Sequence, residues 1–168
     1  MRLTELTLPQ SNQLLAALLT GATLPDATQQ LILATTQGNP FFLEELVRAL
    51  LDQGVLTPQA RIGEITTPET VQQVILSRVE HLPVAQKRLL QMAAVIGRLF
   101  RPRLLATIAP ATLDLDRTLA DLADAALIYQ ERTSPEREYS FKHVLVQDTV
   151  YHALPGRWRA QLHHQVAE

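Results

Sequence analysis

Two short segments of this chain carry residue types that could handle a nucleotide. The first is Gly38-Asn39-Pro40, after which apolar residues repeat at helical spacing, so a helix is expected to begin there. The second contains His143, much further along the chain. A helix start presents backbone N–H groups and the positive end of the helix dipole, and an imidazole can donate a charge-assisted hydrogen bond to a diphosphate. The two segments are therefore the candidates for a nucleotide site in this chain.

The chain has no phosphate-gripping loop of its own. A P-loop needs a glycine-lysine-serine/threonine step, whereas Lys87 follows Gln86 and Lys142 follows Phe141. It also has no cysteine and no Gly-x-Ser-x-Gly elbow, so the sequence shows no candidate nucleophile for covalent catalysis. We therefore expect no catalytic residue and no metal site.

Other chemical candidates have simpler interpretations. Glu44 and Glu45 are neighbours that face different ways on a helix, and Glu44 can pair with Arg48 one turn later, so we interpret them as a solvated face. Asp148 and His152 have the spacing of a metal-ligand pair, but no third ligand accompanies them, and a surface pair is expected. A lone histidine such as residue 143 is more often bonded to backbone than to a ligand.

Length, charge and hydropathy limit the kinds of partner that this chain is expected to bind. A chain of 168 residues, 46% hydrophobic, can bury one good core or two small ones, and we expect two. The formal charge of -2 gives no overall attraction to nucleic acid or to an anionic membrane. No apolar stretch reaches the roughly 18 residues of a membrane span. We expect a cytoplasmic protein without a membrane partner.

The pattern predicts a mainly α-helical chain in two parts. Residues 1–55 hold a predicted strand at residues 2–8 and a small helical lid subdomain with helices at residues 11–20, 26–36 and 40–54. Residues 56–67 are irregular and contain proline and glycine, which predicts a linker.

The second part predicts a winged-helix domain over residues 68–154. Its helices are expected at residues 67–83, 85–97, 103–109 and 114–126. Strands at residues 127–130 and 138–141 flank a polar loop as a short β-hairpin, and a further helix is expected over residues 144–154. Residues 155–168 are expected to begin a following helical region, and both ends are expected to be cut from a longer chain.

Four segments together resemble the STAND class of P-loop ATPases, the signal-transduction ATPases with numerous domains; these segments are residues 38–50, 67–82, 89–97 and 141–154. The bacterial type found behind cyclase domains or ahead of helical repeats and DNA-binding output domains is the most similar. The resemblance covers nearly the whole chain, but only the C-terminal part of the family's switch module. It implies a P-loop ATPase core preceding this segment in cis and a helical-repeat or output domain following it.

The resemblance also implies a ligand. In that family the Gly-x-Pro step, here Gly38-Asn39-Pro40, lies beside the adenine, and the winged-helix histidine, here His143, contacts the β-phosphate of ADP. The implied cofactor is ADP or ATP with Mg in the parent protein, with none expected in the isolated fragment. Plant and animal relatives have an aspartate after the histidine, whereas this chain has Val144, so that aspartate's role in locking the closed state has no counterpart here.

The function implied is a nucleotide-dependent conformational switch in signal transduction and transcription regulation, with ATP hydrolysis belonging to the parent. Two alternatives stay open. The first is a protein-interaction module that needs no nucleotide, which the sequence distinguishes poorly from the nucleotide-dependent switch. A winged-helix DNA-binding module would read DNA with residues 114–126, which carry Arg117 and four aspartates: Asp114, Asp116, Asp121 and Asp124. Phosphates would be repelled by that helix, so nucleic acid is not an expected partner.

Overall fold

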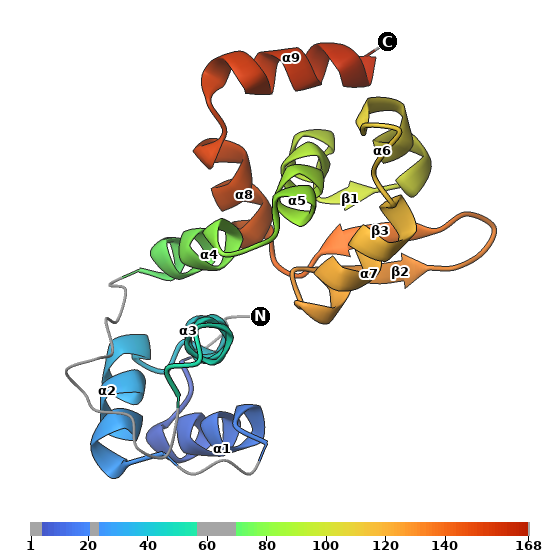
Figure 1. The fold of residues 1–168 in the computed structure, drawn as a ribbon. Coiled ribbons are helices and arrows are strands. Elements are labelled where there is room, and N and C mark those ends of the chain that lie inside the picture. The colour runs from blue at the N-terminus through green and yellow to red at the C-terminus, as the bar shows by residue number, and fades with distance from the viewer. Residues whose placement is uncertain (1–4, 21–23, 57–69, 168) are drawn as a thin grey trace. The chain divides into compact units, whose positions relative to one another are not determined.

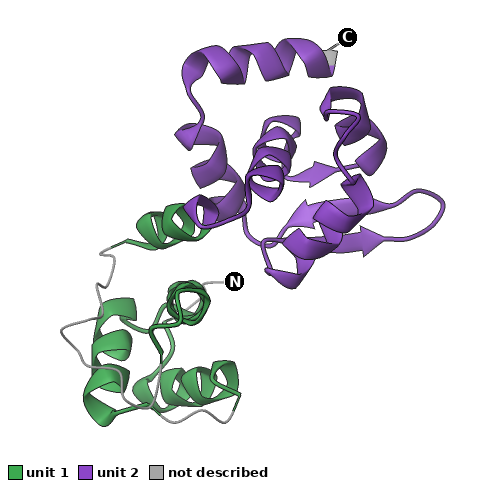
Figure 2. Cartoon of the chain, in the orientation of Figure 1, with its two compact units in different colours: residues 1–78 green, residues 79–168 purple. Residues whose placement is uncertain are grey.

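The computed structural model describes residues 5–20, 24–56 and 70–167. The chain divides into two compact units, residues 1–78 and 79–168 (Figure 2). Helices dominate the described residues, and the strands form one small sheet (Figure 1). The predicted mainly helical fold with a winged-helix domain is therefore confirmed. Apart from residue 56, the predicted linker at 56–67 lies outside the described residues, as does the expected helix opening at 67–69.

The first unit is built from α1 (Leu8–Leu18), α2 (Asp26–Thr36), α3 (Pro40–Asp52) and most of α4 (Val71–Glu80). The bounds of α2 agree with the prediction, and α3 begins at the predicted residue 40 but ends at Asp52 rather than at residue 54. At α3 the side chain of Asn39 accepts the N–H of Phe42 at 3.0 Å, and Pro40 follows at the first helical position.

The strand predicted over residues 2–8 is wrong for its described part. Residues 5–7 belong to no strand, and Leu8 is the first residue of α1. The N–H of Thr7 donates to Oε1 of Gln10 at 2.9 Å, and Pro9 occupies the first turn of the helix. This helix-start chemistry outweighs the alternation of apolar and polar residues that suggested a strand.

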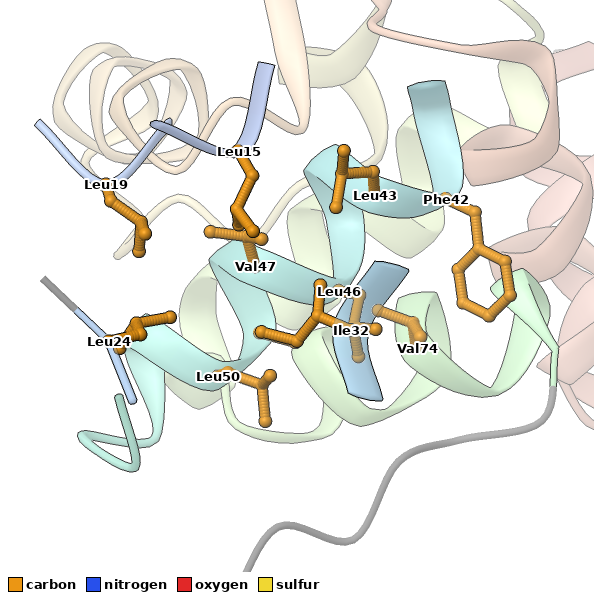
Figure 3. Close-up of a cluster of buried hydrophobic side chains, with 11 residues drawn as sticks. Leu15, Leu19, Leu24, Ile32, Phe42, Leu43, Leu46, Val47, Leu50 and Val74 are labelled. Carbon is orange, nitrogen blue, oxygen red and sulfur yellow. The ribbon is translucent and has the colours of Figure 1, made fainter. Parts of the chain in front are cut away.

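The core of the first unit surrounds α3. Figure 3 shows Leu15 of α1, Leu19 just after that helix and Ile32 of α2 gathered around α3, with Val74 of α4 near Ile32. The buried residues that α3 contributes recur at helical spacing: Phe42, Leu43, Leu46, Val47, Ala49 and Leu50. One side of α3 is therefore the scaffold on which the other helices of this unit pack.

The second unit has the winged-helix order of elements. These are α5 (Val84–Ile96), β1 (Leu99–Phe100), α6 (Pro102–Ile108), α7 (Leu115–Asp124), β2 (Ile128–Arg132) and β3 (Glu138–Phe141). The strands form an antiparallel sheet in the order β1-β3-β2. The β2–β3 hairpin matches the prediction, whereas β1 was not predicted. Two residues are too few to show a strand period, and β1 exists because Leu99 and Phe100 pair with Ser140 and Tyr139.

Helix α5 is the centre of the second unit, as its nearly all-round apolar sequence predicts. It packs against α6, α7 and β1, and also against α8 (Val144–Ala153) and α9 (Gly156–Ala167), which follow the hairpin. The side chain of Gln147 on α8 donates to the backbone carbonyl of Ala94 at 3.0 Å, which fixes α8 along α5. Among the described residues, none of the helices combines the length and apolar character that crossing a membrane requires.

Leu46→Ala tests the importance of α3. Leu46 is fully buried, so this truncation is expected to lower the free energy of unfolding by about 3 kcal/mol through lost transfer energy and a residual cavity. Leu51→Ala on the same helix is the matched control, because Leu51 is 42% exposed, and it is expected to cost less than about 1 kcal/mol. Urea denaturation followed by far-UV circular dichroism measures both. Equal losses in the two variants would contradict the packing described for α3.

Candidate functional site

The turn between α2 and α3 holds two successive residues in the left-handed region, Gln37 at φ 48° and Gly38 at φ 75°. The N–H of Leu6 donates to the carbonyl oxygen of Gly38 at 2.8 Å. A Cβ placed on Gly38 would lie 2.6 Å from the carbonyl oxygen of Leu6. Glycine is therefore required at residue 38 both by its backbone angle and by the chain that runs beside it.

The start of α3 offers fewer hydrogen-bond donors than the sequence suggests. Pro40 has no N–H, and the N–H of Phe42 is taken by the side chain of Asn39. The expectation that a helix beginning at Pro40 presents free N–H groups is thus wrong for these two residues. Asn39 and Pro40 are exposed and Phe41 is half-buried. This surface suits a flat ring better than a phosphate.

His143 lies where β3 passes into α8. Two backbone bonds position this junction: Phe141 donates to the carbonyl of Arg98, and Lys142 donates to that of Leu127, each at 3.0 Å. The half-buried imidazole caps α8, with Nδ1 accepting the N–H of Leu145 at 3.1 Å. His143 therefore makes the hydrogen bond to the backbone that its simpler interpretation expects.

This hydrogen bond also indicates which ring nitrogen of His143 carries the proton. A neutral imidazole whose Nδ1 accepts a hydrogen bond carries its proton on Nε2. The Nε2–H of His143 is therefore a donor of the kind that an anionic oxygen would accept. Gly38, Asn39 and Pro40 belong to the first compact unit and His143 to the second, so their meeting at one ligand stays a prediction.

Sequence reasoning missed a buried ion pair in the first unit. Glu44 pairs with Arg48 at 3.2 Å as predicted, but the interpretation of Glu45 as solvated is wrong. Glu45 Oε2 lies 2.5 Å from Nη1 of Arg78, and the two side chains are 0% and 3% exposed. The signal was present in the spacing, because Glu45 falls between Phe42 and Ala49 on the buried side of α3.

One cation of the surface that would meet DNA in a winged helix is paired within the second unit. Between β2 and β3, residues 133–137 form the wing loop, and its Arg137 lies 2.7 Å from Asp116 of α7. Hydrogen bonding to Asp116 and the charge of its carboxylate raise the pKa of Arg137. Because a wing cation is held by a carboxylate of the would-be recognition helix, phosphate would have to compete for it. This disfavours the DNA-binding alternative.

The remaining candidates have local partners. Nδ1 of His152 lies 2.7 Å from the backbone carbonyl oxygen of Asp148, so the contact between these two exposed residues involves the backbone rather than the carboxylate. The hydroxyl of Tyr151 lies 3.0 Å from Nε2 of His163. Within the described part of the chain, no group of three or more histidine, cysteine, aspartate or glutamate residues is arranged to hold a metal ion.

Comparison with known proteins gives a weak similarity but shows no family. No model of a known protein family matches this chain. An uncharacterized protein of Rhizobium meliloti (strain 1021) is 28% identical over 146 residues, which cover 84% of this chain and 14% of that protein. The chain thus spans only a small part of the length of this relative.

Gly38→Ala tests the turn that precedes α3. The added Cβ meets the carbonyl of Leu6 and the backbone is left-handed, so a loss of about 2 kcal/mol or more in the free energy of unfolding is expected. Gly54→Ala is the matched control: Gly54 has φ 67°, but nothing lies within 4 Å of its added Cβ, so about 1 kcal/mol is expected. Thermal or urea unfolding measures both. If Gly38→Ala lowers the free energy of unfolding no more than Gly54→Ala does, the expected clash between the added Cβ and the carbonyl oxygen of Leu6 is absent.

Proposed function

We propose that this chain is the lid and winged-helix part of a regulatory ATPase of the STAND class and acts as a nucleotide-dependent conformational switch. A P-loop core preceding it in the parent protein would supply the phosphate-binding loop, and a domain following it would carry the output. The sequence resemblance supports this proposal because it runs through both compact units. The winged-helix topology of the second unit agrees with what that resemblance implies.

The observation that carries the proposal is the hydrogen bond from the N–H of Leu145 to Nδ1 of His143. It leaves the ring proton on Nε2, the form in which the imidazole can donate to the β-phosphate of ADP without giving up its cap on α8. At the other half of the site, the exposed Pro40 ring and half-buried Phe41 suit contact with the adenine. In this arrangement the phosphates would be bound by the P-loop core and by His143, rather than by the start of α3.

In this account ADP holds the lid and the winged helix together because it contacts both. Exchange for ATP removes the contact that favours the closed arrangement, so the population shifts toward one in which the winged helix is released. The chain on its own lacks the P-loop core and is expected to bind ADP weakly or not at all. In the parent protein Mg would accompany ATP at the core.

His143→Ala in the parent protein tests the proposal. Loss of a hydrogen bond to a charged phosphate is expected to raise the Kd for ADP by about tenfold or more and to raise basal signalling. A fluorescent ADP analogue measures the affinity. His152→Ala is the control, since His152 is exposed on the same helix and is expected to leave the affinity unchanged.

A second variant separates the ligand contact from the helix cap. His143→Ser restores a capping side chain for the N–H of Leu145 but is too short to reach a phosphate, so it is expected to bind ADP as weakly as the alanine variant. Recovery of ADP affinity in His143→Ser would assign the histidine to capping alone and contradict the proposal. Unchanged ADP affinity in both variants would also contradict it.

A further inference from the structure

The edge strand β1 leaves one pair of main-chain groups without a partner. In the sheet order β1-β3-β2, β3 pairs with only one side of β1 (Figure 1). The N–H of Phe141 donates to the carbonyl of Arg98 at 3.0 Å, and Leu99 lies opposite Ser140. Because hydrogen-bonded and non-hydrogen-bonded pairs alternate in an antiparallel ladder, the N–H and C=O of Leu99 point away from β3. No described residue forms a hydrogen bond with either group.

A partly apolar hollow lies beside this strand. Its volume is about 510 Å³, and Leu99, whose side chain is 51% exposed, belongs to its lining. The other apolar residues of the lining come from the end of α5, from β1 and from α6: Ile96, Phe100 and Leu104. An exposed apolar residue on an open sheet edge favours pairing with another chain. The hollow therefore offers a place for an apolar side chain of a partner.

The charged residues around β1 leave two arginines available to a partner. Nη1 of Arg101 lies 3.6 Å from Oε2 of Glu136, and its Nε lies 3.4 Å from Oε1 of Glu138. Both carboxylates that line the hollow are therefore already paired with a cation. Arg103 also lines the hollow, and Arg98 directly precedes β1. These two arginines are exposed, and neither forms an ion pair with a described residue.

We propose that the edge of β1 and the hollow beside it bind an extended, acidic segment of a partner protein. The segment adds to the sheet as a further strand, with its main chain hydrogen-bonded to Leu99 and an apolar side chain in the hollow. Its carboxylates face Arg98 and Arg103. The site lies within the second unit, requires no nucleotide and does not depend on the function proposed above.

A second copy of this chain is a less suitable occupant of the same edge. It would bring another Arg98 and another Arg103 to the shared edge, and like charges that face each other across an interface are unfavourable. The carboxylates that it could offer there, Glu136 and Glu138, are the ones that Arg101 already holds. The charges therefore favour an acidic partner over self-association.

Peptide binding to the whole chain tests the charge requirement. The probe is a fluorescent peptide with the sequence Ser-Val-Glu-Leu-Glu-Val-Ser and blocked ends, and fluorescence anisotropy measures its Kd. Replacing both glutamates of the probe by lysine is expected to weaken binding by about tenfold or more. Arg103→Glu in the protein is expected to weaken binding of the original probe by about tenfold. Arg117→Glu makes the same change of charge at an exposed position of α7 and is expected to leave the Kd unchanged.

Leu99→Ser tests the apolar contact. Loss of the buried leucine surface is expected to raise the Kd of the same probe by about tenfold. Tyr129→Ser is the matched control, because Tyr129 is 46% exposed and lies on β2, the opposite edge strand of the sheet. Its Kd is expected to equal that of the native chain. Far-UV circular dichroism checks that both variants keep the fold.

Two modified probes distinguish strand addition from other kinds of contact. Successive residues of a strand direct their N–H groups to opposite sides, so N-methylation of alternate residues removes the donors from one side of the peptide at a time. One of the two N-methylated peptides is expected to lose binding while the other keeps it. With saturating native probe, the amide of Leu99 is expected to exchange hydrogen about tenfold more slowly or less, as nuclear magnetic resonance of the isotope-labelled chain measures.

Several results would overturn the proposal. One is equal affinity for the glutamate and lysine peptides, and another is an equal effect of N-methylation on either side. An unchanged Kd in both Leu99→Ser and Arg103→Glu, or no binding of the glutamate peptide up to about 1 mM, would overturn it as well. Dimerisation of the chain that Leu99→Ser abolishes, measured by analytical ultracentrifugation, would instead assign the edge to a second copy.

Discussion

Burial of one side of α3 is the constraint on which the first unit depends. Leucines from α1, Ile32 from α2 and Val74 from α4 all meet that side, so the helix cannot rotate or shift without opening the core. Its two functional features follow from this fixed orientation. The exposed Asn39-Pro40 start is presented at one end, and Glu45 is directed inward to Arg78 further along. A single helix therefore carries both the proposed adenine contact and the buried ion pair.

In the second unit the corresponding constraint is the central strand β3. It pairs with both β1 and β2 and ends two residues before His143, so the histidine is placed by the sheet rather than by a free loop. Its capping of α8 and its proposed contact with phosphate use different ring nitrogens. A structural and a ligand-binding interpretation of this residue are therefore compatible, and the first prepares the tautomer that the second needs.

The helices were predictable because their signals are local. The Asn39 cap with Pro40, and the all-round apolar pattern of α5, each specify a helix from a few neighbouring residues. The errors concern contacts between distant segments. β1 exists only through pairing with β3, and Glu45 is buried only because Arg78 comes from another helix. The supposed strand before α1 failed for the opposite reason, since alternation over a few residues competes poorly with a capping box and a proline.

The proposed switch requires Pro40 and His143 to come together on one nucleotide, and the distance between these two segments can be measured. Because this chain contains no cysteine, spin labels on Gln37→Cys and Asp148→Cys would be unique within it, and both positions are exposed. Pulsed electron paramagnetic resonance on the P-loop-bearing parent, with its other cysteines removed, reports the separation of the two labels. We expect one short, narrow distance distribution with ADP and a longer, broader one with ATP. A distribution that is long with ADP, or the same with both nucleotides, would contradict it.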